Sequence, residues 1–277
     1  MKNNKFNLEN KTALITGSAG LLGSQHAEAL LQNGANIILT DIDKEHLSFT
    51  KAKLQKKYST SKINMHIMDV TDLDSIQNTE KKFKELSLRI DILINNASLN
   101  PKFENKNTQN FSSLEDFTID QWNLDLNVGL MGSFLCTKVF GSTMSKDGLG
   151  GVILNISSDL SVISPNQNIY KSNSNKENLN TIFKPISYSV IKSGLIGMTK
   201  YVATYWADKG VRCNALSPGG VYNNQDKEFV KKISKLIPLN RMAKLDEYQS
   251  AIQFLCSDAS SYLNGQNIVM DGGRSIW

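Results

Sequence analysis

Tyr188 and Lys192 stand four residues apart in the segment YSVIK, where a long helical pattern begins. Residues with this spacing share one face of a helix, so the ammonium of Lys192 can reach the phenol of Tyr188. A free tyrosine titrates near pH 10, roughly three units above neutrality, and a neighbouring positive charge favours the tyrosinate form. The pair therefore suits general acid/base chemistry. Tyr205 and Lys209 have the same spacing, so the surrounding sequence must decide between the two pairs.

Two further segments upstream suit the same reaction. Ser157 and Ser158 close an apolar run, and a serine hydroxyl there can hydrogen-bond and polarise a substrate oxygen. The segment TGSAGLLG (16–23) follows another apolar run and opens a helical pattern. Its glycines allow a tight turn, and a helix N-terminus attracts a pyrophosphate. In this order the segments indicate a nicotinamide-dependent oxidoreductase with a tyrosine acid/base.

Asp41 ends the next apolar run after the glycine-rich turn. An acidic residue at that place hydrogen-bonds the ribose hydroxyls of NAD and repels the extra phosphate of NADP. Neither arginine nor lysine stands at 18–20 or at 42 to receive that phosphate. The sequence therefore predicts NAD rather than NADP, although a simple turn-forming role for Asp41 stays open.

Short β-rich runs alternate with helical patterns, which is typical of a parallel sheet covered by helices on both faces. Strands are expected at 12–16, 36–41, 63–70, 91–97, 150–158, 211–219 and 266–273. Helices are expected at 21–33, 46–58, 72–86, 119–145, 187–208 and 246–257. The predicted fold is one α/β domain over 1–277, with a doubly wound, seven-stranded parallel sheet of Rossmann type.

Two polar stretches without periodicity interrupt this alternation, near 99–118 and near 164–184. Both follow the carboxyl end of a predicted strand, which is the edge where open α/β sheets bind ligands. Each is either a mobile surface insertion or a cover over the substrate. The second is rich in Asn, Ser and Lys, which suits a hydroxyl-rich or phosphorylated ligand better than an acyl chain.

The composition argues against several other classes of protein. Apolar residues make up 40% and charged residues 21% of 277 residues, as in an ordinary soluble protein. The net charge of +5 comes mainly from lysine and follows no stripe with interleaved aromatics, so nucleic-acid binding is not expected. The N-terminus is polar and no apolar run approaches about 18 residues, so neither a signal peptide nor a membrane span is expected. Scattered cysteines and histidines predict neither disulfides nor a metal site, and the chain is expected in the cytoplasm.

Taken together, these motifs make the chain resemble the short-chain dehydrogenase/reductase family over nearly its full length. The family places its tyrosine at the start of the helix after the serine strand, which selects Tyr188, and its catalytic serine matches Ser158. Within the family the chain looks most like flagellin-modification or surface-sugar dehydrogenases. The matching segments are TGSAGLLG (16–23), Asp41, MDVTD (68–72), NNAS (95–98), NISS (155–158), YSVIK (188–192), NALSPGG (214–220), PLNRM (238–242) and NIVMDGG (267–273).

The resemblance implies the roles of individual residues. It makes Ser158, Tyr188 and Lys192 catalytic, with a small polar molecule as substrate. It also implies a homo-oligomer, a tetramer or a dimer, for which helices 119–145 and 187–208 have apolar faces to pair. The implied residues of the cofactor site are Gly17, Gly20, Leu22, Gly23, Asp41, Ile42, Asp69, Val70, Asn96, Ala97, Tyr188, Lys192, Pro218, Gly219 and Val221.

Three positions depart from the family pattern. The middle glycine of the turn is Leu21, with Gly20 beside it, and the last glycine of the family's NNAG is Ser98. The active-site asparagine of the family corresponds to Gly129. Asn127 lies two residues away, about 200° round a helix, and is expected to face elsewhere. The resemblance therefore does not extend to the family's asparagine-bound water relay.

The sequence thus predicts an NAD-dependent oxidoreductase that interconverts a secondary alcohol and a ketone. The expected substrate is sugar-like, a sugar phosphate or a nucleotide sugar. One alternative is an NADPH-dependent 3-oxoacyl-carrier-protein-type reductase, which Asp41 disfavours. The other is a non-catalytic dinucleotide-binding protein, which the glycine at position 129 alone supports.

Overall fold

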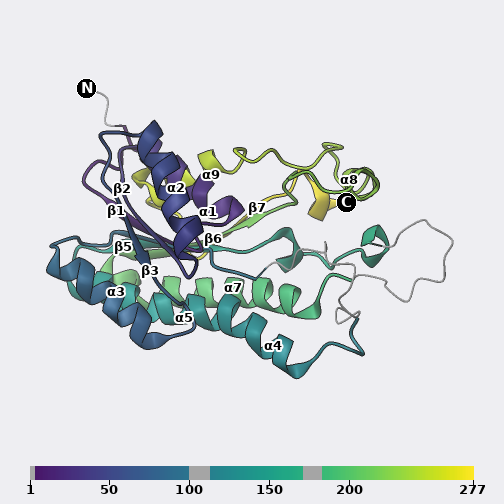
Figure 1. The fold of residues 1–277 in the computed structure, drawn as a ribbon, viewed down its shortest axis with the longest axis horizontal. Helices are drawn as coiled ribbons and strands as arrows, with labels where there is room; N and C mark the ends of the chain where they lie inside the picture. The colour runs from purple at the N-terminus through teal and green to yellow at the C-terminus, as the bar shows by residue number, and fades with distance from the viewer. Residues whose placement is uncertain (1–3, 100–112, 171–182) are drawn as a thin grey trace.

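The computed structural model describes residues 4–99, 113–170 and 183–277. Seven parallel strands form one sheet in the order β3-β2-β1-β4-β5-β6-β7 (Figure 1). The order reverses between β1 and β4, which is the switch point where such sheets bind ligands. The predicted doubly wound sheet is confirmed. Its strands are β1 (Thr12–Thr16), β2 (Asn36–Asp41), β3 (Ile63–Ile67), β4 (Ile92–Asn95), β5 (Gly151–Ile156), β6 (Val211–Pro218) and β7 (Asn267–Met270).

Helices cover both faces of this sheet, with α1, α2 and α9 on one face and α3, α4, α5 and α7 on the other (Figure 1). Each face has its own buried core. Neighbouring residues of one strand enter different cores, as Leu14 and Ile15 of β1 do, because side chains alternate along a strand. The helices are α1 (Leu21–Gln32), α2 (Lys44–Lys57), α3 (Leu73–Glu85), α4 (Ile119–Leu126), α5 (Gly132–Cys136), α7 (Ile186–Tyr205) and α9 (Gln249–Cys256).

The helix predicted at 119–145 is present but is not a regular α-helix along its whole length. It runs through α4, α5 and α6 (Ser142–Lys146) and contains two π-helical turns, Asn127–Met131 and Thr137–Gly141. A π-turn adds one residue to a helical turn and is frequent at functional sites. The first of these turns contains Gly129, the position where the family carries its asparagine.

Several predicted strands end earlier in the structure. Strands β3, β4 and β5 end at Ile67, Asn95 and Ile156, because the residues that follow form the loops at the carboxyl edge of the sheet. One helix was not predicted, α8 (Lys227–Ser234). Asp226 caps its N-terminus, because its carboxylate accepts hydrogen bonds from two backbone amides of the first turn.

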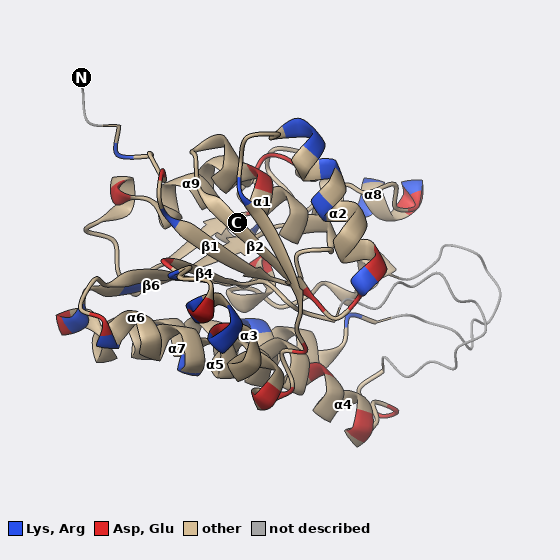
Figure 2. Cartoon of the chain, turned by 60° about the vertical axis from the view of Figure 1, so that its left-hand side comes forward, with Lys and Arg blue, Asp and Glu red and all other residues tan. Residues whose placement is uncertain are grey.

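Basic and acidic residues are interspersed along the outer helices in the view of Figure 2. In the described part of the chain no helix has the length and apolar character needed to cross a membrane. The same residues contain no group of three or more side chains arranged to hold a metal ion.

Candidate active site

The serine pair lies where β5 meets the carboxyl edge of the sheet. Ser157 donates a hydrogen bond of 2.7 Å to the carbonyl oxygen of Lys192, so it ties β5 to α7. Ser158 starts the short turn that follows: its Oγ accepts from the amide of Leu160 at 3.2 Å and donates to Oδ1 of Asp159 at 2.9 Å. Ser157 therefore has a structural role, and Ser158 is the serine that lies beside Tyr188.

Tyr188 and Lys192 lie one turn apart at the start of α7. The Lys192 Nζ is 5.6 Å from the centroid of the Tyr188 ring and donates to the carbonyl oxygen of Ile156 at 2.9 Å. The structure thus brings Ser158, Tyr188 and Lys192 together at one edge of the sheet. Tyr205 lies at the far end of the same helix, 62% exposed, and stacks on a neighbouring tyrosine instead.

The electrostatics at Tyr188 contain opposing contributions. Burial raises the pKa of Tyr188, a hydrogen bond with Ser158 lowers it, and the charge of Asp159 raises it. Burial also lowers the pKa of Lys192 to about 8, with a further contribution from the charge of Lys184. A lysine with that pKa is still about nine-tenths protonated at neutral pH. Lys192 therefore still presents a positive charge to the phenol.

Lys184 is a second cation at the tyrosine, and in the sequence it is only one of the lysines of the second insertion. Its Nζ lies 3.6 Å from the centroid of the Tyr188 ring. The side chain of Gln167 binds both polar groups of the Lys184 backbone. It accepts a hydrogen bond from the Lys184 amide at 2.9 Å and donates one to the Lys184 carbonyl oxygen at 3.1 Å. Burial lowers the pKa of Lys184 to about 8, against the charges of Asp159 and Asp125.

A buried ion pair stands behind the serine. Nη1 of Arg274, close to the end of the chain, donates to Oδ2 of Asp159 at 2.8 Å, and the two side chains are only 8% and 4% exposed. The other oxygen of the same carboxylate accepts from Ser158. Arg274 therefore holds the group that orients the Ser158 hydroxyl. Sequence analysis singled out neither member, because they lie 115 residues apart.

The position of the family's asparagine has no room for a side chain. A Cβ on Gly129 would lie 2.8 Å from Cγ2 and 3.2 Å from Cδ1 of Ile191, a buried residue of α7. The carbonyl oxygen of Gly129 accepts from the Ser133 hydroxyl at 2.9 Å. Asn127 lies on the exposed side of the helix, as its spacing predicts. An amide side chain is therefore missing from this part of the site.

The glycine-rich turn fits a dinucleotide. Gly17 has φ +60°, and a Cβ on it would lie 2.8 Å from Cα of Ala97, so only glycine fits this close approach of two loops. A Cβ on Gly23 would meet the carbonyl oxygen of Gly17. Asn96 Nδ2 secures the turn by donating to the carbonyl oxygens of Thr16 and Gly17 at 2.9 and 3.0 Å. Helix α1 begins directly afterwards without a side-chain cap, so its first amides can face a phosphate.

Asp41 is fixed between the loops that follow β1 and β2. Its carboxylate accepts from the amides of Ala19 at 3.0 Å and Asp43 at 3.1 Å, and Ile42 beside it is 67% exposed. The other cofactor residues named from the family lie at the carboxyl ends of β1, β3, β4 and β6 or in the segments that follow these strands, at the same edge of the sheet. These are Gly20, Leu22, Asp69, Val70, Asn96, Ala97, Pro218, Gly219 and Val221.

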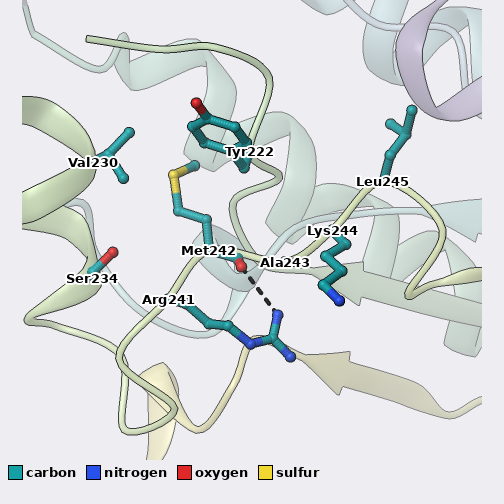
Figure 3. A pocket seen from close by; sticks show the side chains of 8 residues that line it. All are labelled: Tyr222, Val230, Ser234, Arg241, Met242, Ala243, Lys244 and Leu245. Atoms are coloured by element: carbon teal, nitrogen blue, oxygen red, sulfur yellow. Dashed lines mark hydrogen bonds between the residues drawn. The ribbon is translucent and has the colours of Figure 1, made fainter. Parts of the chain in front are cut away.

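Two of the cavities lined by described residues lie near this edge. The larger, of ≈ 430 Å³, lies between α8 and the segment that follows it and is shown in Figure 3. Met242, one of its lining residues, also packs against Gly220 of the β6 loop. Neither Ser158, Tyr188 nor Lys192 lines it. The smaller, of ≈ 10 Å³, lies at the tyrosine and is lined by Leu99, Asp125, Lys184, Pro185, Ser187, Tyr188 and Ile191.

Comparison with known proteins gives matches along almost the whole chain. Residues 17–275 match the protein family described as enoyl-(acyl carrier protein) reductase. An NAD-dependent glycerol dehydrogenase of Listeria innocua is 29% identical over 98% of this chain and 96% of its own length. A 3-oxoacyl-[acyl-carrier-protein] reductase of Thermotoga maritima is 32% identical over 97% of this chain and 99% of its own. A solved gluconate 5-dehydrogenase from Burkholderia cenocepacia, in complex with NADP and tartrate, has a TM-score of 0.83 at 27% identity and covers 98% of both chains.

Proposed function

The chain belongs to the short-chain dehydrogenase/reductase family and is an oxidoreductase, and we propose that it interconverts a secondary alcohol and a ketone on a polar, sugar-like substrate with NAD. The observation that carries the proposal is a half-buried tyrosine, Tyr188, beside two lysine ammonium groups and the hydroxyl of Ser158. Burial raises the pKa of this phenol, whereas the positive charges beside it favour the tyrosinate, so the group can act as a general acid and base. The family assignment removes the support for a non-catalytic binding protein.

In the oxidation direction Ser158 hydrogen-bonds the substrate hydroxyl and Tyr188, as tyrosinate, takes its proton. Lys192, whose Nζ lies 5.6 Å from the centroid of the Tyr188 ring, keeps a positive charge near the phenol and so favours the ionised form. NAD, when bound, supplies the acceptor of the hydride. In the reduction direction Tyr188 returns the proton to the carbonyl oxygen. Ser158 polarises that oxygen beforehand, once its hydroxyl hydrogen has turned from Asp159 to the substrate.

The preference for NAD rests on Asp41. Its carboxylate is held by backbone amides at the end of β2, where the family binds the adenosine ribose, and a fixed negative charge there repels the extra phosphate of NADP. The relatives differ: the Listeria enzyme is NAD-dependent, and the Burkholderia structure contains NADP. We therefore expect NAD to be preferred by at least about tenfold, which corresponds to roughly 1.4 kcal/mol.

Substrate class is proposed from the polar insertions and the relatives. Asn, Ser and Lys side chains suit a hydroxyl-rich ligand, and the relatives include glycerol and gluconate dehydrogenases. The narrower resemblance to surface-sugar dehydrogenases supports a sugar phosphate or nucleotide sugar. The Thermotoga relative keeps a 3-oxoacyl-carrier-protein-type reductase as the second candidate.

Three features of the proposal concern the chain as a whole. We propose that residues 1–277 form one domain and that its insertions near 99–118 and 164–184 cover the substrate. Residues 100–112 and 171–182 of these insertions lie outside the residues that the structure describes. We also propose a homo-oligomer. Its support is the exposed apolar side chains of α4, α5 and α7, namely Ile119, Leu124, Phe134, Ile186 and Val190.

A substrate panel with a matched variant tests the proposal. Purified protein is assayed with NAD and NADP against glycerol, gluconate, sugar phosphates, nucleotide sugars and a 3-oxoacyl thioester. We expect turnover of a hydroxylated substrate with NAD. Tyr188→Phe should lower that rate by about 10²–10⁴-fold and leave NADH binding intact, with Tyr205→Phe as a silent control. Turnover of the thioester alone, with NADPH, would overturn the proposal in favour of the second candidate.

A further inference from the structure

The catalytic tyrosine has a closer cation than the lysine that the family motif supplies. Lys184 Nζ lies 3.6 Å from the centroid of the Tyr188 ring, whereas Lys192 Nζ lies 5.6 Å from it. The first distance is that of a cation over the face of an aromatic ring. Lys184 precedes α7, so its position depends on the loop and does not follow from helical spacing.

We propose that Lys184 is a positioning residue for catalysis, whose ammonium stabilises the tyrosinate form of Tyr188 from the face of its ring. This inference rests on the proposed function, because it takes Tyr188 as the acid/base. The negative charge of a phenolate is partly delocalised onto the ring carbons, so a cation over the ring attracts the ionised form more strongly than the neutral one. An opposite charge within ∼4–6 Å typically lowers the pKa of an acid by about 1–3.

The site needs this contribution because other groups act against the tyrosinate. Burial raises the pKa of Tyr188, and the charge of Asp159 raises it further. The family's asparagine is absent, since Ile191 fills the space in front of Gly129. The titratable and charged groups around the phenol in the described part of the chain are Lys184, Lys192, Asp159, Asp125, Tyr170 and Arg274.

The local structure fixes Lys184 for this role. Gln167 binds both backbone polar groups of Lys184, so the stem of the side chain starts from a fixed point. Pro185 follows as the N-cap residue of α7, which begins at Ile186, so Tyr188 lies in the first turn of the helix. The ammonium is mostly protonated at neutral pH, because burial lowers its pKa only to about 8 while Tyr188 is neutral. A tyrosinate beside it would hold the lysine's proton to higher pH, so the two groups titrate as a coupled pair.

Direct titration of Tyr188 in the substrate-free protein tests the proposal. The protein is labelled with ¹³Cζ-tyrosine, and the Tyr188 signal is identified by its loss in Tyr188→Phe. Lys184→Met should raise the measured pKa of Tyr188 by about one pH unit or more, a tenfold change in ionisation. Lys184→Arg keeps the charge and should restore most of the effect. Lys200 is an exposed lysine of α7, and Lys200→Met is the matched control, which should leave the pKa of Tyr188 unchanged.

Two further variants separate this role from a structural one. Gln167→Ala frees the backbone of Lys184 without touching the phenol, and it should give a smaller rise of the same sign. Lys184→Met should leave the melting temperature unchanged or raise it, because the folded state disfavours the charged form of Lys184. The pKa of Lys184 falls from 10.5 in the unfolded chain to about 8 in the fold. The resulting loss of folding stability therefore grows as pH drops from 10.5 towards 8 and is complete below pH 8. A lysine retained for packing would lower the melting temperature when removed.

The outcomes distinguish the inference from the proposed function. If Lys184→Met leaves the Tyr188 titration unchanged, or if Lys184→Arg shifts it equally, Lys184 does not act through its charge and the inference is overturned. The proposed function would survive that result, since it depends on the substrate panel and Tyr188→Phe. Conversely, a shifted titration would stand even if no alcohol substrate were found.

Discussion

Gly129→Ala, combined with Ile191→Ala, tests the explanation for the missing asparagine. The Cβ added at position 129 would lie 2.8 Å from Cγ2 of Ile191, which is closer than real contacts allow. Overpacking of a buried site costs about 1–3 kcal/mol, and alanine in a helix interior gains about 1 kcal/mol over glycine. The free energy of unfolding of Gly129→Ala should therefore be lower by up to about 2 kcal/mol.

The second substitution removes the colliding atoms. Ile191→Ala alone should cost about 2–5 kcal/mol, because Ile191 is buried and its removal leaves a cavity. In that background Gly129→Ala should stabilise by about 1 kcal/mol or more, since the clash is gone and the helix propensity remains. The double-mutant cycle should then give a coupling of about 1–3 kcal/mol, measured by urea unfolding at one protein concentration.

A neighbouring glycine provides the control. Gly197 lies on the exposed side of α7, and a Cβ there would meet no atom within 4 Å. Gly197→Ala should stabilise the protein by about 1 kcal/mol in either background. Additivity of Gly129→Ala and Ile191→Ala within about 0.5 kcal/mol would refute the steric argument, and so would a stabilisation by Gly129→Ala equal to that of the control.

Three more predictions concern the cofactor, the ion pair and acid stability. Asp41→Ala should narrow the preference for NAD in kcat/KM, and equal wild-type efficiency with both cofactors would contradict its assignment. Arg274→Leu should lower the unfolding free energy by about 3–5 kcal/mol in urea, because Asp159 stays buried without its partner, and Asp159→Leu added to it should restore part of the loss. Burial lowers the pKa of His26 to about 3 in the folded protein, compared with 6.5 in the unfolded chain. The unfolded state therefore takes up a proton first, and the free energy of unfolding should fall by up to about 1.4 kcal/mol per pH unit as pH falls from 6.5 towards 3. His26→Gln should flatten that slope; an unchanged slope between pH 7 and 5 would show that other groups cause it.

The sheet and the main helices could be predicted because their signals are local. Buried parallel strands read as short apolar runs, and Tyr188 and Lys192 reveal themselves by the spacing of one helical turn. The order of the motifs then selects Tyr188 over Tyr205, whose exposure at the far end of α7 agrees with that choice. Helix α8 was missed, although Asp226 before a charged and apolar alternation is an ordinary helix start.

The remaining parts of the site depend on contacts that no local pattern contains. Lys184 reaches the ring because Gln167, 17 residues away, binds its backbone. Asp159 and Arg274 meet only when the last segment of the chain folds against the β5 loop. The collision at Gly129 likewise depends on the packing of two helices. Such pairings follow from the tertiary structure, so a sequence can suggest the residues but not the partners.

The ion pair and the second lysine act on the same quantity, the stability of the tyrosinate. Asp159 raises the pKa of Tyr188, and Arg274, bound to its carboxylate at 2.8 Å, opposes that negative charge. Removing Arg274 should therefore raise the pKa of Tyr188 as well as destabilise the fold, whereas removing Lys184 should raise the pKa without the loss of stability. The two variants separate the two roles, because an unpaired buried carboxylate costs both folding and ionisation. Alcohol oxidation needs the tyrosinate, so in both variants the rise of kcat/KM with pH should move to higher pH.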